Sequence, residues 1–449
     1  MIGGHMGATS RWALAAAAGL LAGSFALQAQ AADLGGDCCA ELETRIAELE
    51  ATTARKGNRK VSLEVSGQVN RALLVWDDSF DSDAYIVDND QTSTRFRFRG
   101  SGTIKAGWKA GFLIEIELQD AASNDVDQFD DEGLGENLGI LTRHASWFIE
   151  SERLGRVTLG QTSPGTDDLT LINLGGSLSD AELYFNNSFF LRDKFGNFTG
   201  LTWGQIASGL DTPRGDFIRY DTPSIYGFIF SAAWGENDRW DAAVRYQQEW
   251  NSVRIAAGIG YFWNGDPGLF FLDQFGNRRR DSVDVEEVKG ALSIMHIPSG
   301  LYASFAAGTR DVSDFRDVDA SGVVEVTREG YDADFYYLQL GITKRFLPYG
   351  ATTFFGEYGR YNDFGANLFT TTFVGGVEED FFVKGTEVDR WGFGLVQAFD
   401  DAALEVYAQF YYYAADVDGY FLNTELDYRR NKFEIEDWQA AVLGARIRF

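Results

Sequence analysis

The sequence is poor in the residues on which metal proteins and disulfide-rich proteins depend. Its 449 residues include 2 cysteines, 3 histidines, 3 methionines and 6 prolines. The cysteines are Cys38 and Cys39, and because they are adjacent and near the N-terminus they exclude a disulfide framework that holds the main body together. No His, Cys and carboxylate spacing resembles a metal site, so we expect neither a metal nor another cofactor.

Positive charge and long apolar runs are scarce as well. The chain has 39 Lys and Arg against 67 Asp and Glu, a formal net charge of −28. Nucleic-acid binding requires clustered positive charge, so this class of partner is excluded. Beyond the N-terminal segment no run approaches the roughly 18 apolar residues of a transmembrane helix.

The first 31 residues have the organisation of a secretory signal peptide. Arg11 precedes an apolar stretch from Trp12 to Leu27, and Ala29 and Ala31 place small residues at the cleavage positions. We therefore assign 1–31 to the signal and expect Ala32 to be the new N-terminus. A lipid-modified Cys38 is the alternative, but Asp37 fits a lipoprotein cleavage site poorly.

A short helical segment is predicted over 32–58. Cys39, Leu42, Ile46 and Leu49 are spaced alternately three and four residues apart, as in the seam of a coiled coil. Helices of fewer than about 12 to 15 residues are marginal alone, so this one needs partner helices, which three copies of an oligomeric protein supply. A linker with accidental spacing is the alternative.

From residue 59 to residue 449 the apolar period is two. In one stretch Phe112, Ile114, Ile116 and Leu118 alternate with Glu115 and Glu117, which is typical of strands with one apolar and one polar face. We expect an all-β fold, a transmembrane antiparallel β-barrel of about sixteen strands. The strands are predicted to begin near residues 61, 93, 108, 140, 155, 215, 227, 239, 252, 283, 301, 332, 351, 387, 402 and 437.

The connections favour a membrane barrel over a soluble sandwich. Tight turns, such as Trp250-Asn251 and Asp400-Asp401, alternate with long polar stretches, as short periplasmic turns alternate with long outer loops. Tryptophans near strand ends suggest an interfacial girdle, although buried packing is the alternative for any single one. They are Trp76, Trp147, Trp203, Trp234, Trp250, Trp263, Trp391 and Trp438.

Two groups of arginines are predicted to face the lumen. Arg95, Arg97 and Arg99 lie on one face of a strand, and each would cost about 2 to 4 kcal/mol against lipid near mid-membrane. Arg446 and Arg448 share a face of the last strand, which barrel closure brings beside the first, so they extend the basic wall.

The connection near 164–214 is too long for an ordinary hairpin loop. If it folds inward, its carboxylates face the arginines across a narrow gap and create a transverse field that orients polar solutes. The carboxylates are Asp167, Asp168, Asp180 and Glu182. A solvated outer loop is the alternative.

The chain resembles the trimeric general porins of alphaproteobacteria. The resemblance is carried by the blocks at 37–70, 143–150 (RHASWFIE), 154–161 (LGRVTLGQ) and 218–223 (IRYDTP), by STRFRFRG at 93–100 and by the terminal ARIRF. It implies a sixteen-stranded barrel, a homotrimer, an inward-folded third loop, and Phe449 as the signal read by the outer-membrane assembly machinery. In some related barrels an N-terminal Ala-Asp is joined to peptidoglycan, which implicates Ala32 here.

We therefore expect a passive porin in the Gram-negative outer membrane, surrounded by lipid and lipopolysaccharide, through which small hydrophilic solutes and ions diffuse. We expect no catalytic residue; a barrel hydrolase would need His144 or His296. Two alternatives remain: an oligosaccharide-selective channel with Tyr407, Tyr411 and Tyr413 as a stacking track, and a peptidoglycan anchor with incidental pore activity. Net acidity favours cation preference.

Overall fold

The computed structural model describes residues 60–449, apart from 134–138, 237, 266–269, 273–277, 281–282, 319–323, 375–376 and 423–428. The predicted signal peptide and helical segment, with Ala32 and the seam residues Cys39, Leu42, Ile46 and Leu49, lie outside the described residues. In the described part of the chain, no helix is long and apolar enough to cross a membrane.

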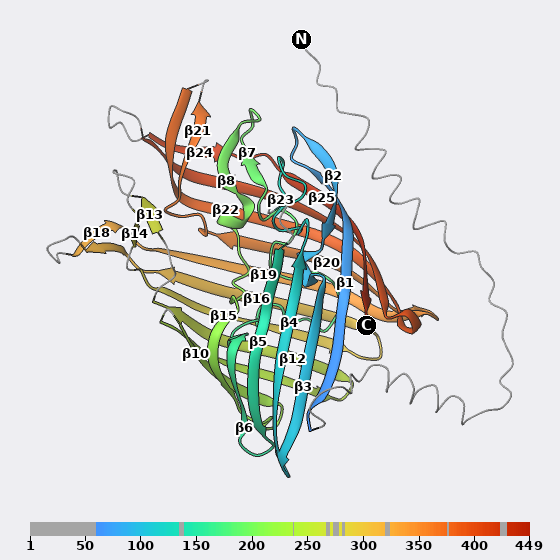
Figure 1. Cartoon of the computed structure of the whole chain (residues 1–449). Coiled ribbons are helices and arrows are strands. Elements are labelled where there is room, and N and C mark those ends of the chain that lie inside the picture. Colours follow the sequence, from blue (N-terminus) through green and yellow to red (C-terminus); the bar gives the residue numbers. More distant parts are fainter. Residues whose placement is uncertain are drawn as a thin grey trace.

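Sixteen antiparallel strands form a closed barrel (Figure 1). Each pairs with the next, and β1 pairs with β25 to close the sheet, with Gln68 opposite Arg448 and Asp77 opposite Gln439. The strands are β1 (Ser62–Asp77), β3 (Arg95–Lys105), β4 (Trp108–Gln119), β5 (Gly139–Ser151), β6 (Gly155–Thr162), β9 (Gly215–Asp221), β10 (Phe228–Gly235), β11 (Arg239–Trp250), β12 (Val253–Asn264), β15 (Val285–His296), β16 (Leu301–Val312), β19 (Tyr331–Leu347), β20 (Gly350–Asn362), β22 (Val377–Phe399), β23 (Leu404–Leu422) and β25 (Trp438–Arg448).

Shorter elements lie in the connections. Three of them, β2, β21 and β24, extend the main sheet, and three hairpins stand apart from it. The hairpins are β7–β8, β13–β14 and β17–β18. All the elements in the connections are β2 (Ser82–Asp88), η1 (Asp90–Thr92), β7 (Phe190–Arg192), β8 (Phe198–Thr202), α3 (Trp203–Ile206), β13 (Phe270–Leu272), β14 (Arg278–Arg280), β17 (Phe315–Val318), β18 (Val324–Arg328), β21 (Phe369–Val374), η2 (Asp400–Ala402) and β24 (Arg429–Glu434).

The predicted barrel is confirmed, and its strands begin where the alternation starts, with one exception. Strand β22 begins at Val377, whereas the sequence predicted a start near residue 387. The additional residues form a hairpin with β21, in which Val374 pairs with Val377. In the pairing of β22 with β23, the register then shifts between Val383 and Gly385. A bulge of this kind interrupts the period of two, so the alternation does not reveal this part of the strand.

The polarity of the wall is opposite to that of a soluble protein. In β19 the apolar Leu338 and Leu340 are 40% and 55% exposed, whereas the polar Gln339 between them is 0% exposed. The same arrangement recurs in β15, where Lys289 is buried and Val288 is exposed. An apolar outer face and a polar inner face are what a strand in a membrane barrel requires.

The predicted tryptophans divide between exposed and buried positions. Trp147, Trp234, Trp250 and Trp391 are exposed, as an interfacial belt requires. For Trp76, Trp203 and Trp438 the prediction of a girdle is wrong, because each is 1–2% exposed. Trp76 and Trp438 point inward and contact the ring of Phe189, at 5.1 and 5.3 Å between centroids, so a long loop covers them.

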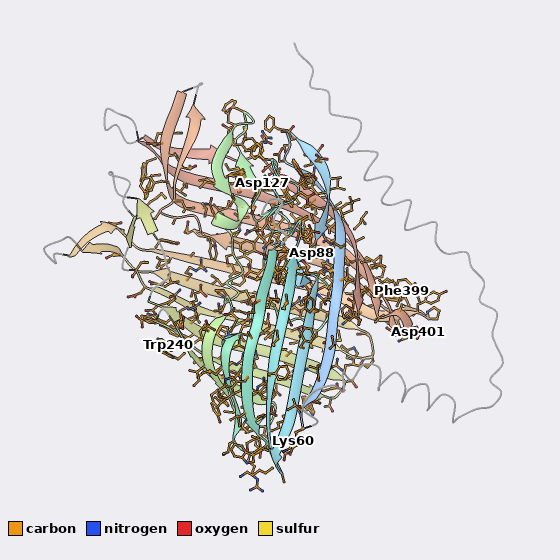
Figure 2. The ribbon with its side chains drawn as sticks, viewed as in Figure 1. Lys60, Asp88, Asp127, Trp240, Phe399 and Asp401 are labelled. Atoms are coloured by element: carbon orange, nitrogen blue, oxygen red, sulfur yellow. The ribbon has the colours of Figure 1, made fainter. Side chains whose placement is uncertain are left out.

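The two ends of the barrel differ. One end carries short turns, such as Gly107 between β3 and β4 and η2 between β22 and β23, and the other carries the long connections. In Figure 2, Lys60 and Asp401 lie among the turns, whereas Asp127 lies in a long connection toward the other end. The long connection after β6, residues 163–214, turns back into the barrel.

Candidate functional site

Residues 178–182 of this connection are bound to the opposite wall of the barrel. Their main-chain carbonyl oxygens accept hydrogen bonds from wall side chains of four different strands. Gln409 Nε2 donates to Leu178 at 2.6 Å, Gln339 Nε2 to Ser179 at 3.3 Å, the Tyr361 hydroxyl to Ala181 at 2.6 Å and Arg390 Nη1 to Glu182 at 2.8 Å. The loop therefore crosses the lumen and is fixed on its far side.

Arg390 is the charged centre of this attachment. Its side chain is 2% exposed and its Nη2 lies 2.5 Å from Glu357 Oε1, an equally buried carboxylate. The same Nη2 donates to Ser179 Oγ at 2.9 Å, and the guanidinium lies 5.2 Å from the ring centre of Tyr411. A buried charge is tolerated only when it is paired and hydrogen-bonded, and both conditions hold here.

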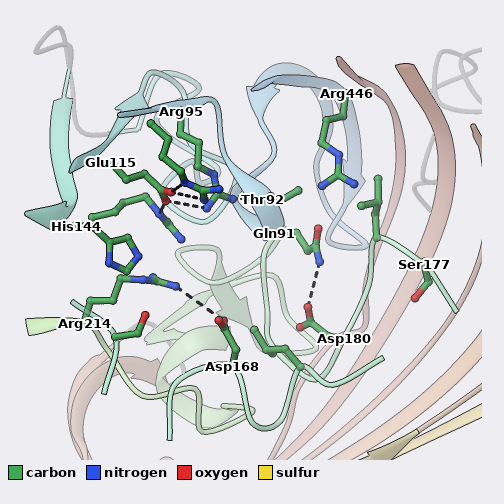
Figure 3. A pocket seen from close by; sticks show the side chains of 15 residues that line it. Gln91, Thr92, Arg95, Glu115, His144, Asp168, Ser177, Asp180, Arg214 and Arg446 are labelled. Atoms are coloured by element: carbon green, nitrogen blue, oxygen red, sulfur yellow. Dashed lines mark hydrogen bonds and ion pairs between the residues drawn. The ribbon is translucent and has the colours of Figure 1, made fainter. Parts of the chain in front are cut away.

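The loop leaves a space of about 400 Å³ between itself and the wall formed by β3, β4 and β5. Figure 3 shows the arginines of the wall on one side and carboxylates of the loop on the other. The lining residues are Gln91, Thr92, Arg95, Arg97, Glu115, Arg143, His144, Ser163, Asp168, Leu171, Ser177, Leu178, Asp180, Arg214 and Arg446.

The arginines of the wall are already paired with carboxylates of the wall. Glu115, 1% exposed, accepts from Arg97 Nε at 2.5 Å, from Arg143 Nε at 2.8 Å and from Arg95 Nη1 at 3.3 Å. Arg143 Nη1 also reaches Glu117 at 2.5 Å. Three guanidiniums and two carboxylates thus form one network, which holds the cations rigidly and leaves a small net positive charge toward the space.

Arg143 lies in this network because of a bulge. Simple alternation along β5 puts Arg143 on the same outer face as Ala145 and Trp147. In the structure Glu115 of β4 pairs with His144, but the next residue of β4, Ile116, pairs with Thr142. Arg143 is therefore the extra residue of a bulge. A bulge re-aims the neighbouring side chain, and both Arg143 and His144 border the space.

Asp168 and Asp180 provide the negative side. Asp168 is 61% exposed toward the lumen and lies 3.8 Å from Arg214 Nη2. Asp180 accepts hydrogen bonds from Gln91 Nε2 at 3.2 Å and from the Tyr184 hydroxyl at 3.3 Å. Burial, reinforced by the nearby charge of Glu182, raises the pKa of Asp180 to about 6.

The other predicted constriction residues lie elsewhere. Arg99 is an exposed residue nearer the turn end of β3 and does not line the space. Asp167 is 1% exposed and directed toward Arg214 at 3.3 Å, while Glu182 Oε1 accepts from the backbone of Asp211 at 2.7 Å. Arg446 lines the space, whereas Arg448 lies beyond it; both pair with Glu405 at 2.5 Å.

Among the described residues, the carboxylates grouped closely enough for a metal ion are Asp167, Asp168 and Asp211. One oxygen from each lies within 4.8 Å of the others. Arg214 lies against the first two, so a guanidinium already supplies positive charge at this place. Burial and the charge of Asp167 raise the pKa of Asp211 well above its usual value, which is a further response to crowded carboxylates.

The space is also lined by four residues that the sequence did not predict: Gln91, Thr92, Arg143 and Arg214. Gln91 and Thr92 belong to η1, in the connection between β2 and β3, and their inward position has no counterpart in the alternation.

His296 lies on the outer face, where Nδ1 contacts Ser299 Oγ at 2.8 Å. The three tyrosines of the suggested stacking track are 1–2% exposed, and the ring of Tyr411 stacks on Phe185 of the loop at 5.4 Å.

Comparison with known proteins gives one family and a consistent fold. A family model described as Gram-negative porin matches residues 13–419, which is more than half of the chain. The anion-selective porin from Comamonas acidovorans superposes with a TM-score of 0.53 at 16% identity, covering 87% of this chain and 100% of that one. A loop-L8 deletion mutant of OmpT from Vibrio cholerae gives 0.51 at 13% identity, with 87% and 100% covered.

A trimer form of in-vitro folded OmpT, an outer membrane protein of Vibrio cholerae, gives a TM-score of 0.50 at 14% identity, covering 87% of this chain and 99% of that one. At such low identities the superpositions establish the fold and nothing about solutes. None of the curated protein sequences matches this chain.

Proposed function

The chain belongs to the family of Gram-negative porins, and from this premise we propose that the space of about 400 Å³ is the constriction of its channel. The protein is a passive channel of the outer membrane, a β-barrel with a polar inner face. The observation that supports the constriction is the loop fixed across the lumen, which places Asp168 and Asp180 opposite the arginine network of the wall. A solute crossing the barrel would meet charges of both signs there.

We propose that small hydrophilic solutes and ions pass, with a weak preference for cations. The positive charge around the space comes from its lining arginines. Three of these arginines, Arg97, Arg143 and Arg446, are already paired with Glu115, Glu117 and Glu405, which weakens their attraction for anions. The chain as a whole carries a net charge of −28, and the potential at the mouths of the channel follows this excess. The Comamonas relative is described as anion-selective, so the sign needs its own measurement. A zero-current potential in a KCl gradient across a planar bilayer gives it.

The constriction is tested by single Arg→Ser changes on one strand face. Arg97→Ser removes one of the three arginines paired with Glu115, and we expect the K⁺ to Cl⁻ permeability ratio to rise by about a factor of three, as expected for one charge within several ångströms of a hydrated ion. Arg99→Ser is the matched control, since Arg99 has the same orientation but does not line the space. Equal effects of the two changes would reject the constriction.

We propose a homotrimer, which the trimer form of a structural relative supports. The predicted seam at Cys39, Leu42, Ile46 and Leu49 would contribute a three-stranded coil below the barrels. Deletion of 33–58, with Ala32 retained, should weaken the trimer without removing it. Unheated gel electrophoresis and chemical cross-linking measure this, and an unchanged trimer melting temperature would assign 33–58 to a linker.

The remaining assignments concern the chain ends. We propose cleavage of 1–31, with 32–58 as a periplasmic segment and 59–449 as the barrel, and recognition of Phe449 by the assembly machinery. Contacts with lipopolysaccharide, membership of the alphaproteobacterial subgroup and attachment of Ala32 to peptidoglycan are proposed on the resemblance alone. Muropeptide bound to Ala32 after lysozyme digestion would support the anchoring role, which is compatible with a pore.

We also propose that the chain has no catalytic activity, in keeping with a family of channels. In the described part of the chain, His144 lies beside the arginine network without a nucleophile arrangement around it, and His296 lies on the outer face at a turn. The oligosaccharide-selective alternative is disfavoured because Tyr407, Tyr411 and Tyr413 are buried. Saturable block of the current by oligosaccharides would revive it.

A further inference from the structure

We propose that residues 88–94, from the last residue of β2 to the start of β3, form a second wall of the constriction, and that Gln91 is a specificity-determining residue in it. The inference rests on the proposed function, because it assumes that solutes pass through the space of about 400 Å³. The constriction proposed above does not require a wall at residues 88–94, so an experiment can reject this second wall and leave the constriction in place.

This segment folds inward because its polar side chains satisfy its own backbone. Asn89 Oδ1 accepts from the backbone of Gln91 at 3.0 Å and starts the turn η1, while Asp88 Oδ1 accepts from the backbone of Thr94 at 2.8 Å. Such local hydrogen bonds are the reason that Asn and Asp favour tight turns. The sequence Asp88-Asn89-Asp90 thus reverses the chain into the lumen before β3 begins.

The wall of the barrel then fixes the turn. Asn89 is 0% exposed, and its Nδ2 donates to the Tyr407 hydroxyl at 2.9 Å. Thr92 is bound through its carbonyl oxygen, which accepts from Gln68 Nε2 at 2.6 Å and from Asn70 Nδ2 at 3.0 Å. Side chains of β1 and β23 therefore hold the turn against the inner face of the barrel. An ordinary outer loop would extend into solvent instead.

The turn also contacts the inward loop. Gln91 Nε2 donates to Asp180 Oδ2 at 3.2 Å, as the dashed line in Figure 3 marks. Ser123, from the connection after β4, joins the two loops as well: its Oγ accepts from the backbone of Asp90 at 3.0 Å and donates to the Tyr184 carbonyl at 2.5 Å. Three connections that are far apart in the sequence meet at this place.

A solute in the space therefore meets two loops and the wall. Gln91 and Thr92 line it together with Asp180 and Arg446. Because Gln91 binds one oxygen of Asp180, it fixes where the loop carboxylate is presented and competes with solutes for it. A change at Gln91 should alter selectivity through Asp180 even though Gln91 carries no charge.

The test places a charge at this position. Gln91→Cys is prepared in a Cys38→Ser, Cys39→Ser background, and a cationic methanethiosulfonate reagent is applied to single channels in a planar bilayer. We expect a stepwise fall in current and a shift of the K⁺ to Cl⁻ permeability ratio toward anions by about a factor of three. Gln91→Glu should shift the ratio toward cations.

Gln128 provides a matched control. Its Nε2 also donates to an aspartate oxygen at 3.2 Å, that of Asp78, and it also lies in a long connection, but it does not line the space. Gln128→Cys with the reagent, and Gln128→Glu, should leave current and selectivity unchanged. Mass spectrometry confirms that each thiol is modified.

Two outcomes separate the proposals. If modified Gln91→Cys and Gln91→Glu conduct as the parent does, while Arg97→Ser still changes the permeability ratio, the second wall is refuted and the constriction stands. If Arg97→Ser has no effect either, the constriction itself is refuted.

Discussion

The buried pair of Arg390 and Glu357 should affect both the stability of the barrel and the position of the loop. Variants at these two residues are expected to distinguish the two effects. Arg390→Met leaves Glu357 as an unpaired carboxylate at 0% side-chain exposure. Removing one partner of a buried pair costs about 3 to 5 kcal/mol, because the remaining charge stays desolvated. Urea unfolding of the barrel in lipid vesicles, followed by tryptophan fluorescence, measures this loss.

The control is Arg360→Met on the neighbouring strand β20. Arg360 pairs with Asp389 at 2.7 Å, but its side chain is 31% exposed, and exposed pairs contribute about 0 to 1 kcal/mol. The same chemical change on the two faces of the wall should thus differ severalfold in its effect. Equal losses of stability would contradict the expected difference between the buried and the exposed pair.

A double variant isolates the loop. Glu357→Gln removes the unpaired charge but keeps an oxygen for the Tyr337 hydroxyl, which donates to Glu357 at 2.8 Å. Arg390→Met with Glu357→Gln should therefore recover more than half of the lost stability. The bonds from Arg390 to Ser179 and Glu182 remain absent, so single-channel conductance should remain altered. Wild-type conductance in the double variant would show that other contacts suffice to hold the loop.

Two further predictions concern charge and the closure of the barrel. Burial raises the pKa of Asp180 to about 6, above the usual value for a carboxyl group, so its negative charge is present at pH 7.5 and lost as the pH falls through about 6. The K⁺ to Cl⁻ permeability ratio should fall between pH 7.5 and pH 5. For a raised pKa protonation favours the folded state, so unfolding does not explain the fall; Asp180→Asn should remove this step, and an unchanged step would assign it to another group. At the closing seam, Gly67→Val should impair folding, because a Cβ atom there would lie 2.5 Å from the Phe449 ring and 2.6 Å from the Arg95 carbonyl oxygen. Heat-modifiability on gels follows it, with Gly356→Val as control, where the nearest atom is 3.9 Å away; equal yields of folded barrel would contradict the prediction.

The barrel follows from the sequence because alternation is a local property. Each strand start except that of β22 lies within two residues of the predicted one, since lipid outside and polar groups inside impose the same period on every strand. The same alternation places Arg95 and Arg97 in the lumen. It fails at Arg143, where a bulge reverses the face, and no local signal marks that bulge.

The arrangement of the lumen depends on contacts between segments far apart in the chain. Glu115 neutralises arginines on two other strands, and Gln91 reaches Asp180 across 89 positions of sequence. Trp76 and Trp438 look like interfacial residues when read along their own strands, but the loop buries them. Alternation predicts which face a side chain takes, and it does not predict what covers that face.

The closing seam between β1 and β25 constrains how the molecule is made. Residues 68–77 pair with residues 439–448, so the first strand lacks one neighbour until β25 has been synthesised and delivered. During this interval both edges of the growing sheet are unpaired, and such edges recruit other chains. Contacts of such long sequence separation also slow folding. Loss of β25 would therefore leave β1 and β23 without the strand that joins them, and their unpaired edges could pair with other chains.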